Sequence, residues 1–342
     1  MKTSVVILNW NGENFLREYL PSVVEHCGNE STEIVVADNH STDGSIDLLR
    51  SEFPTVRIIE LDQNYGFAGG YNRALCQIDS EYYVLCNSDI LLKSDAVSPI
   101  IEAMDDDKSV AVAAPKLKAL MEPDMFEYAG AAGGFIDKYG YPFCRGRIMD
   151  TVEKDEGQYN DECEIFWATG AFMVVRSSVW RELGGLDDSF FAHMEEIDMC
   201  WRVKNRGFRV MYYPQAEAFH LGGGTLNQGN PRKIFLNFRN SLWMLFKNLP
   251  KGKLITRLYI RMCMDGASAM IYLCKGQISY FWAVLRAHWA LYGNMGRLWR
   301  ARQKELSSSE TNKKTPTCML DGSMVWRYMI KKLRTFNKLY TK

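Results

Sequence analysis

The order of strand-like and helix-like segments in the first 120 residues constrains the fold most. Short runs of β-branched and aromatic residues alternate with stretches whose apolar residues recur at helical spacing. This alternation predicts right-handed crossovers and an α/β protein with a mostly parallel, twisted sheet and helices on both faces. The predicted strands are Ser4–Leu8, Glu33–Ala37, Val56–Leu61, Tyr82–Cys86 and Val110–Ala114, and the predicted helices between them are Phe15–Val24, Ser45–Leu49 and Ala68–Ile78.

The later chain is less regular. Residues 121–162 hold many glycines and charges, which predicts a long loop excursion with short hairpins. From Phe235 onward the apolar spacing is helical, so we expect a sheet-containing domain over residues 1–240 and a helical region over residues 241–342. The other predicted elements are a strand at Ile165–Val175, helices at Ser177–Leu183 and Glu195–Asn205, and a strand at Arg209–Tyr213 that ends at Pro214.

The charges divide between these two parts. Residues 1–240 hold 22 Lys+Arg and 37 Asp+Glu, whereas residues 241–342 hold 19 and 4, so the net charges are −15 and +15. An acidic body argues against a nucleic-acid partner, and a basic region indicates an anionic one. In the basic region Trp243, Trp282, Trp289 and Trp299 lie among Lys and Arg. Two interpretations stay open: a helical surface that faces anionic lipid, or a helical subdomain packed on the body.

Several features indicate a cytoplasmic protein. The nine cysteines are an odd number without a Cys-x-x-Cys pair, which is typical of reduced thiols. The apolar run Val5–Leu8 is too short for a secretory signal, and stretches such as Gly276–Leu285 are shorter than the ~18 apolar residues of a transmembrane helix. Under the lipid interpretation of the basic region, the protein would sit peripherally on the inner face of the cell membrane.

Polar side chains follow the predicted strands at the points where these strands end. Asn9 and Asn11 follow the first strand, Asp38 follows the second, and Asn87 and Asp89 follow the fourth. Ligands of open α/β sheets bind in the crevice outside the carboxyl ends of the strands. We therefore expect a binding site at this edge.

A set of motifs in fixed order carries a family resemblance. They are Asp38-Asn39-His40-Ser41-Thr42-Asp43-Gly44-Ser45, Asn64–Arg73, Asn87-Ser88-Asp89, Gly170–Arg176, Gly184-Gly185-Leu186-Asp187, Phe190–Asp198 and His220-Leu221-Gly222-Gly223-Gly224-Thr225. The ordered set resembles inverting family 2 glycosyltransferases of the GT-A fold, and among them the rhamnosyltransferase-like branch. The resemblance implies a Rossmann-like sheet, a UDP- or dTDP-sugar donor, a divalent metal (Mg²⁺ or Mn²⁺) and a hydroxyl on a glycan or lipid-linked glycan as acceptor.

The resemblance also implies roles for residues at the strand ends. Asp89 matches the last Asp of the family's Asp-x-Asp motif, which binds the metal, while Asn87 stands at the first position. His220 matches a His that acts on the metal or the diphosphate, and it fits a buried neutral His equally well. Asp38 matches the Asp that recognises the base, with an ordinary turn as the alternative. The predicted donor-binding residues are Asn9, Asn11, Asp38, Asn64, Gly66, Arg73, Asn87 and Asp89; for Arg73, a solvated helix residue is the alternative.

Inverting transfer needs one general base, which removes the proton of the attacking hydroxyl. The family places it in a Glu-Asp pair at a helix start, so here Glu196 of Glu195-Glu196 stands at the base position and Glu195 is the alternative. Adjacent carboxylates, with Asp198 nearby, raise one another's pKa. They also suit a first helical turn without any catalytic role. His193 is expected to pack in the acceptor site.

Other functions fit less well. Asn9-Trp10-Asn11-Gly12 follows the first strand in place of Gly-x-Gly-x-x-Gly, which argues against a nicotinamide-dependent oxidoreductase. A catalytically degenerate GT-A protein, which binds a nucleotide sugar or a partner without turnover, is the remaining alternative. The carboxylates at positions 38, 89 and 196, together with His220, favour the enzyme.

Overall fold

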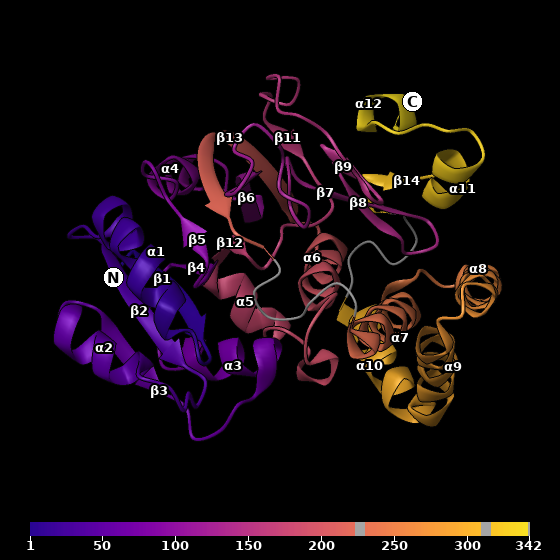
Figure 1. Ribbon diagram of the computed structural model, residues 1–342, viewed down its shortest axis with the longest axis horizontal. Helices are drawn as coiled ribbons and strands as arrows, with labels where there is room; N and C mark the ends of the chain where they lie inside the picture. Colours follow the sequence, from indigo (N-terminus) through magenta and orange to yellow (C-terminus); the bar gives the residue numbers. More distant parts are fainter. Residues whose placement is uncertain (223–229, 309–315, 341–342) are drawn as a thin grey trace.

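The computed structural model describes residues 1–222, 230–308 and 316–340 (Figure 1). Gly223, Gly224 and Thr225 of the last sequence motif lie outside these residues. The main sheet follows the order β11-β13-β6-β12-β4-β1-β2-β3, with β5 paired to β13. Its strands are β1 (Thr3–Asn9), β2 (Thr32–Asp38), β3 (Arg57–Glu60), β4 (Tyr82–Asn87), β5 (Ile90–Leu91), β6 (Val110–Ala119), β11 (Cys163–Glu164), β12 (Phe172–Arg176) and β13 (Arg209–His220).

The predicted α/β architecture is confirmed. Strands β3, β2, β1, β4, β6 and β13 run in one direction, and β12 lies antiparallel between β4 and β6. One face carries α1 (Glu13–Cys27), α2 (Ser45–Glu52) and α4 (Ser98–Asp106), whose buried residues form one apolar cluster. The other face carries α3 (Gly66–Leu75), α5 (Ser177–Leu183) and α6 (Glu195–Asn205) in a second cluster. Both faces are buried because crossover helices cover them.

Three predicted strands differ from the structure by more than one residue at one end, and one of them, predicted at Val110–Ala114, continues as β6 to Ala119. Strand β13 continues past Pro214 to His220, because the proline lies at an irregularity of its pairing with β6, between Tyr213 and Glu217. A proline inside a sheet is tolerated at such a bulge, since its missing N–H leaves no ladder bond unmade there. The predicted strand Ile165–Val175 is shorter in the structure, where β12 begins at Phe172. This extension of β13 carries His220 to β5, where it pairs with Ile90.

The predicted excursion over residues 121–162 contains hairpin strands of a small second sheet, with the order β10-β9-β8-β7-β14. Four of these strands come from the excursion, but β14 comes from the C-terminal part of the chain and pairs in parallel with β7. Figure 1 shows this yellow segment beside the magenta strands. The strands are β7 (Gly134–Asp137), β8 (Pro142–Cys144), β9 (Arg147–Ile148), β10 (Thr151–Val152) and β14 (Met319–Leu320).

The C-terminal part of the chain is mainly helical, as predicted. Helix α7 packs against α6 of the body and against α8, α9 and α10. The boundary predicted between residues 240 and 241 lies within α7, and this division into domains stays a prediction. No helix of the described residues is both long enough and apolar enough to span a bilayer. The helices are α7 (Pro231–Asn248), α8 (Leu254–Cys274), α9 (Ile278–Gly293), α10 (Met295–Ser308), α11 (Met324–Met329) and α12 (Phe336–Leu339).

Candidate active site

The ends of β1, β2 and β4 meet at one edge of the main sheet. The strand register places Asn9 opposite Asp38 and Leu8 opposite Asn87. Asn9 Nδ2 donates a hydrogen bond to Asp38 Oδ1 at 3.0 Å, and both side chains are buried. The Asn9 Oδ1 atom is buried without a hydrogen-bond partner. The structure therefore brings the predicted strand-end residues together, with one polar atom unused.

The loop after β2 surrounds Asp38. Asp38 Oδ2 accepts from the Ser41 N–H at 2.8 Å. This is the hydrogen bond of an ordinary turn, which was the alternative to base recognition for Asp38. Asp43 makes the turn that leads into α2, since its Oδ1 accepts from the Ser45 N–H at 3.1 Å. Asn11, with a positive φ of 50°, accepts from the Thr42 N–H through Oδ1 at 2.7 Å. Asn9, Asn11 and Asp38 thus belong to one hydrogen-bonded group.

Asn39 joins this group to the second predicted donor segment. Its Nδ2 lies 3.1 Å from both Asn64 Oδ1 and the Gly66 carbonyl oxygen, and its Oδ1 accepts from the Tyr65 N–H. Gly66 has a φ of +70°, and a Cβ there would meet the Phe191 ring at 2.8 Å. A side chain is thus excluded by backbone conformation and by contact. Asn39 lies in the first sequence motif, but the motif predicted no role for it.

Arg73 lies at the edge of this region and is partly exposed. Its Nη1 contacts Asp188 Oδ2 at 3.2 Å, and its guanidinium stacks 3.5 Å from the centroid of the Tyr65 ring. These contacts hold the cation beside the donor segment. The same contacts are compatible with Arg73 as an ordinary solvated residue of α3 and with Arg73 as a phosphate ligand. The role of Arg73 in donor binding therefore stays a prediction.

Asp89 and His220 meet where β5 pairs with β13. His220 Nε2 lies 3.1 Å from Asp89 Oδ1 and 3.3 Å from Asn87 Nδ2, and both Asp89 and His220 are more than nine-tenths buried. The contact joins the third strand-end motif to the last motif of the sequence. The two predicted metal-binding residues are therefore neighbours.

Glu127 completes this group, although it belongs to none of the sequence motifs. It is buried, and its Oε1 lies 3.2 Å from His220 Nδ1 as an ion-pair contact. Burial alone would lower the pKa of His220, but the contacts with Asp89 and Glu127 raise it to about 10. Burial raises the pKa of Asp89, but the hydrogen bond and charge of His220, together with backbone hydrogen bonds, more than offset this, so the pKa of Asp89 lies below its ordinary value.

In the described residues, no group of three or more His, Cys, Asp or Glu side chains has the arrangement of a complete metal site. Asp89 and His220 supply one oxygen and one nitrogen, at 3.1 Å from each other. Neighbouring ligands of an octahedral ion with bonds of about 2.1 Å are about 3 Å apart. The pair therefore fits two coordination positions once the metal has displaced the proton on His220 Nε2, because only an unprotonated imidazole nitrogen binds a metal. The other ligands would have to come from a bound molecule or water.

The two candidate bases lie at the start of α6. Glu195 is buried, Glu196 is partly buried, and each has an Oε2 atom that is buried without a hydrogen-bond partner. Burial, followed by the charge of Glu196, raises the pKa of Glu195 well above its ordinary range. Burial raises the pKa of Glu196 to about 7. A carboxylate with this pKa accepts a proton near neutral pH.

The loop before α6 is held in a strained conformation. Phe191, His193 and Met194 have φ values of 67°, 69° and 74°, which non-glycine residues rarely adopt. Asn240 of α7 is fully buried and its Nδ2 contacts the carbonyl oxygens of Phe190, Ala192 and His193 at 2.7–3.1 Å. Such strain persists only where surrounding contacts over-determine it, and it is often found at functional sites.

This loop also contacts the donor segment. The Phe67 N–H donates to the Phe191 carbonyl oxygen at 3.1 Å, and Phe191 packs on Gly66. His193 is neutral, because burial lowers its pKa to about 4. The candidate base segment and the second donor segment are therefore adjacent.

Asp198 lies one turn farther along α6 and is fully buried. Its oxygens accept from Arg202 Nε at 2.9 Å, Lys247 Nζ at 3.0 Å and Asn248 Nδ2 at 2.8 Å. These contacts tie α6 to α7 and leave Asp198 without the free oxygen that Glu195 and Glu196 have. Its charge still raises the pKa of Glu195, after burial and Glu196.

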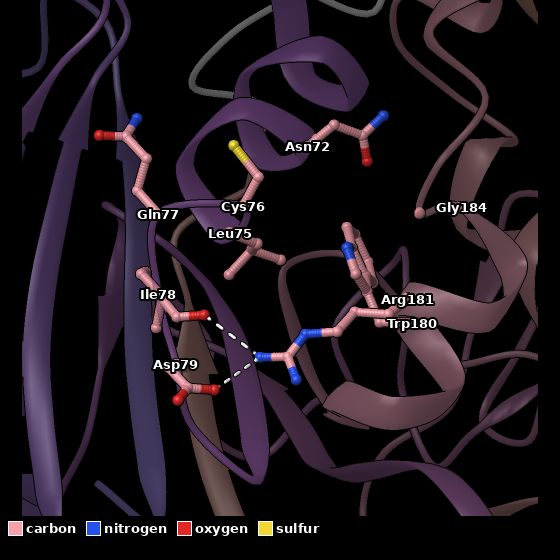
Figure 2. Close-up of a pocket in the computed structure, with 10 residues that line it drawn as sticks. Asn72, Leu75, Cys76, Gln77, Ile78, Asp79, Trp180, Arg181 and Gly184 are labelled. Carbon is pink, nitrogen blue, oxygen red and sulfur yellow. Dashed lines mark hydrogen bonds and ion pairs between the residues drawn. The ribbon is translucent and has the colours of Figure 1, made fainter.

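A surface cleft of about 650 Å³ lies elsewhere on the molecule (Figure 2). It is lined by the end of α3, by Ile78 and Asp79 before β4, and by Trp180 and Arg181 of α5. Arg181 Nη2 donates to Asp79 Oδ1 at 3.0 Å. Since Ile78 and Asp79 precede β4 whereas Asn87 ends it, this cleft is at the opposite edge from the strand-end residues.

Comparison with known proteins decides the family. A sequence model described as "Glycosyl transferase family 2" matches residues 4–183, which extend from β1 to the end of α5. The chain belongs to glycosyl transferase family 2. The match includes Asp38 and Asp89, but Glu196 and His220 lie beyond it.

Two relatives of this family 2 chain are named as rhamnosyltransferases. An N-acetylglucosaminyl-diphospho-decaprenol L-rhamnosyltransferase of Mycobacterium tuberculosis is 24% identical over 205 residues, which are 55% of this chain and 66% of the relative. The matched part is therefore just under two thirds of that relative's length. Rhamnosyltransferase WbbL of Escherichia coli is 25% identical over 263 residues, which are 74% of this chain and 94% of the relative.

A solved structure supports the fold. GalNAc-T7, determined with UDP, GalNAc and Mn²⁺, superposes with a TM-score of 0.57 at 15% identity, covering 72% of this chain and 48% of that one. The predicted GT-A fold of the chain is confirmed, and so is its resemblance to the rhamnosyltransferase-like branch.

Proposed function

We propose that this protein is an inverting glycosyltransferase that moves a sugar from a nucleotide diphosphate to a hydroxyl of a glycan or lipid-linked glycan, in cell-surface polysaccharide synthesis. The observation that carries the proposal is the Glu196 carboxyl group. It has a buried oxygen without a partner and a pKa raised to about 7 by burial, and it starts the helix whose preceding loop touches the donor segment.

In the proposed reaction, Glu196 accepts the proton of the acceptor hydroxyl as the hydroxyl oxygen attacks the anomeric carbon. The new glycosidic bond forms while the bond to the diphosphate breaks, and the diphosphate leaves with the electron pair, which inverts the anomeric centre. Glu195 remains the alternative base. In this scheme Asp198 holds α6 against α7 and contributes its negative charge, which favours a raised pKa at the pair.

The diphosphate is the donor part that most needs neutralising. Asp89 and His220 would hold a Mg²⁺ or Mn²⁺ ion, which stabilises the charge of the departing diphosphate when it is bound. Support comes from the 3.1 Å separation of the two side-chain atoms. Asn87 lies beside His220 and would contact the same part of the donor.

The nucleoside part of the donor would bind along the other strand ends. Asp38 would accept from a uracil or thymine ring, with Asn9 and Asn11 fixing its loop, and Asn64, Gly66 and Arg73 would border the nucleotide. The unused Asn9 Oδ1 supports a ligand at this position, because buried polar atoms are seldom left unpaired. The sugar is proposed to be rhamnose because the two relatives described above are named rhamnosyltransferases.

The acceptor and the location follow from the same relatives. One is named for a decaprenol-linked acceptor, so a lipid-linked glycan is the proposed acceptor. An acceptor of this kind would place the protein in the cytoplasm, peripherally on the inner face of the cell membrane.

Donor turnover in the presence of Mn²⁺ tests the proposal. UDP- and dTDP-sugars, dTDP-rhamnose included, should be hydrolysed or transferred, with release of the nucleotide measured by chromatography. Glu196→Gln should lower kcat at least about a hundredfold, because a general base contributes about that much, while nucleotide binding is retained. Activity that survives in both Glu196→Gln and Glu195→Gln would remove the base assignment. Binding without turnover in the unmodified protein would favour the degenerate alternative.

A further inference from the structure

Helix α8 places its charged side chains toward the protein. Arg261 is 3% exposed and Asp265 is 0% exposed. Arg261 Nε donates to Asp265 Oδ1 at 2.7 Å, and Arg261 Nη1 donates to the Tyr139 carbonyl oxygen at 3.1 Å. The helix is thus anchored to the small sheet by charges on the side where a surface helix of a water-soluble protein usually carries its apolar residues.

The outward side of α8 is apolar along the length of the helix. Ile255, Tyr259, Cys263, Ala267 and Ile271 are all exposed and follow one another at intervals of four residues, so each is adjacent to the next and the row winds across the outward half of the helix. We call these five residues the apolar stripe. Ile255, Tyr259 and Ile271 are 83%, 69% and 51% exposed. A continuous apolar surface of this kind marks a docking site, because leaving it in water is unfavourable.

Helix α9 adds aromatic side chains to the same part of the molecule. Trp282, Trp289 and Tyr292 are 48%, 61% and 58% exposed, and the centroids of the two indole rings are 6.3 Å apart. Figure 1 shows α8 and α9 at the end of the molecule away from β1, β2 and β3. Tryptophan and tyrosine are enriched where an apolar phase meets water, because their rings are apolar and their N–H or O–H groups are polar.

The charges around this surface decide between a bilayer and a second copy of the chain. Lys251 and Lys275 flank α8, and both are exposed. The only carboxylates in the sequences of α8, α9 and α10 are Asp265 and Glu305, and both are buried in ion pairs with arginine. A second copy on this surface would bring cations against cations, whereas anionic lipid would neutralise them. Exposed cations on α9 and α10 are Arg286, Arg300 and Lys304.

We propose that α8 and α9 form a lipid-docking surface for an anionic bilayer. The apolar stripe enters the boundary between headgroups and acyl chains with α8 lying along the membrane plane, and the flanking lysines contact the headgroups. This inference deepens the membrane contact that the proposed function requires, and it rests on that function for the biological role of the contact. Burial of the apolar stripe of α8 provides the affinity for the bilayer, and the surrounding cations provide the preference for anionic lipid.

Vesicle flotation with the full chain tests this assignment. Vesicles of phosphatidylcholine alone are compared with vesicles that also contain phosphatidylglycerol. The unmodified protein should float with the anionic vesicles, and the triple substitution Ile255→Ser, Tyr259→Ser, Ile271→Ser should weaken binding at least about tenfold, because large apolar side chains lose their burial. Ile330→Ser is the matched control, since Ile330 is 58% exposed outside the stripe, and it should leave binding unchanged. Lys251→Glu with Lys275→Glu should reduce the preference for phosphatidylglycerol.

Three results would overturn the proposal. They are absence of binding to either vesicle by the unmodified protein, equal binding by the triple variant, and a dimer in light scattering that the triple variant dissociates. Thermal stabilisation by UDP with Mn²⁺ is measured on each variant to show that it is folded. Donor turnover is assayed separately with a water-soluble acceptor. If the protein floats with vesicles but does not turn over the donor, the result counts against the proposed enzyme alone. If it turns over the donor but does not float with vesicles, the result counts against the lipid surface alone.

Discussion

Single side chains at the candidate site differ in how completely their hydrogen-bonding capacity is used. Asp198 has its oxygens engaged by Arg202, Lys247 and Asn248, whereas Glu195 and Glu196 each keep one buried oxygen without a partner. An unpaired buried oxygen is costly unless a ligand uses it. The difference favours the pair at the helix start as the reactive carboxylates.

Activity should depend on pH through Glu196. Its pKa is raised to about 7 by burial, so the carboxylate that accepts the proton forms as pH rises through about 7. We expect kcat/KM to increase with pH, with an apparent pKa near 7 that belongs to the coupled Glu195–Glu196 pair. A pH–rate profile at saturating Mn²⁺ measures it. A profile that is flat from about pH 5 to about pH 8 would show that an unperturbed carboxylate, or none, serves as base.

Glu127 should control metal affinity through His220. A carboxylate that contacts the second nitrogen of a histidine orients the ring for its ligand, and the loss of such a group typically weakens metal binding about tenfold or more. We therefore expect Glu127→Gln to raise the Kd for Mn²⁺ about tenfold in calorimetry without substrate. Glu122→Gln, at an exposed position in the same segment, is the control and should change nothing. Equal Mn²⁺ affinity in Glu127→Gln would remove the positioning role.

At the scale of elements, one buried aspartate connects the excursion to the C-terminal helices. Asp137, at the end of β7, is fully buried. Its Oδ1 accepts from the N–H groups of Tyr139 and Tyr141, and its Oδ2 accepts from the Met324 N–H at the start of α11, at 2.9 Å. Strand β14 lies just before this contact and pairs with β7. The strand pair and this carboxyl group therefore both connect the two segments.

Asp137→Asn should destabilise the protein by about 2 kcal/mol, because an amide N–H would face the Met324 N–H and leave it unpaired. Burial raises the pKa of Asp137 to about 6, so the stabilisation it provides is present at low pH and is lost as pH rises through about 6. Asn does not titrate, so the difference between the two proteins should narrow as pH rises from about 4, the ordinary pKa of an aspartate, to about 6. Urea denaturation measures both effects. Asp321→Asn, at an exposed ion pair with Lys138, is the control; an equal loss there would contradict the assignment.

Elements with strong local patterns were predicted well. Helices Ser177–Leu183 and Glu195–Asn205 have the predicted bounds, and Tyr82–Cys86 differs from β4 by one residue. Their boundaries are marked by local features such as Gly184, whose φ of 74° ends α5. Strand β13 was predicted too short because Pro214 normally ends a strand, and only the neighbouring strand reveals the bulge that tolerates it.

At the scale of the whole molecule, the contacts between distant segments escaped prediction. Glu127 lies in an irregular segment, and no local spacing connects it to His220. The family resemblance implied that Asp89 and His220 act at the same site, and in the structure His220 Nε2 lies 3.1 Å from Asp89 Oδ1. The outward stripe of α8 was missed because its apolar residues have the same spacing as a buried face. Which side of a helix meets solvent depends on the rest of the fold.

The pairing of β14 with β7 has a consequence for synthesis of the chain. The small sheet needs Met319 and Leu320 for its last strand, while its first strand begins at Gly134. During translation, the open side of β7 therefore stays unpaired until Met319 and Leu320 have left the ribosome. Until then its unpaired N–H and C=O groups are available to other extended segments, so a nascent chain stalled before residue 319 would be the form most in need of a chaperone.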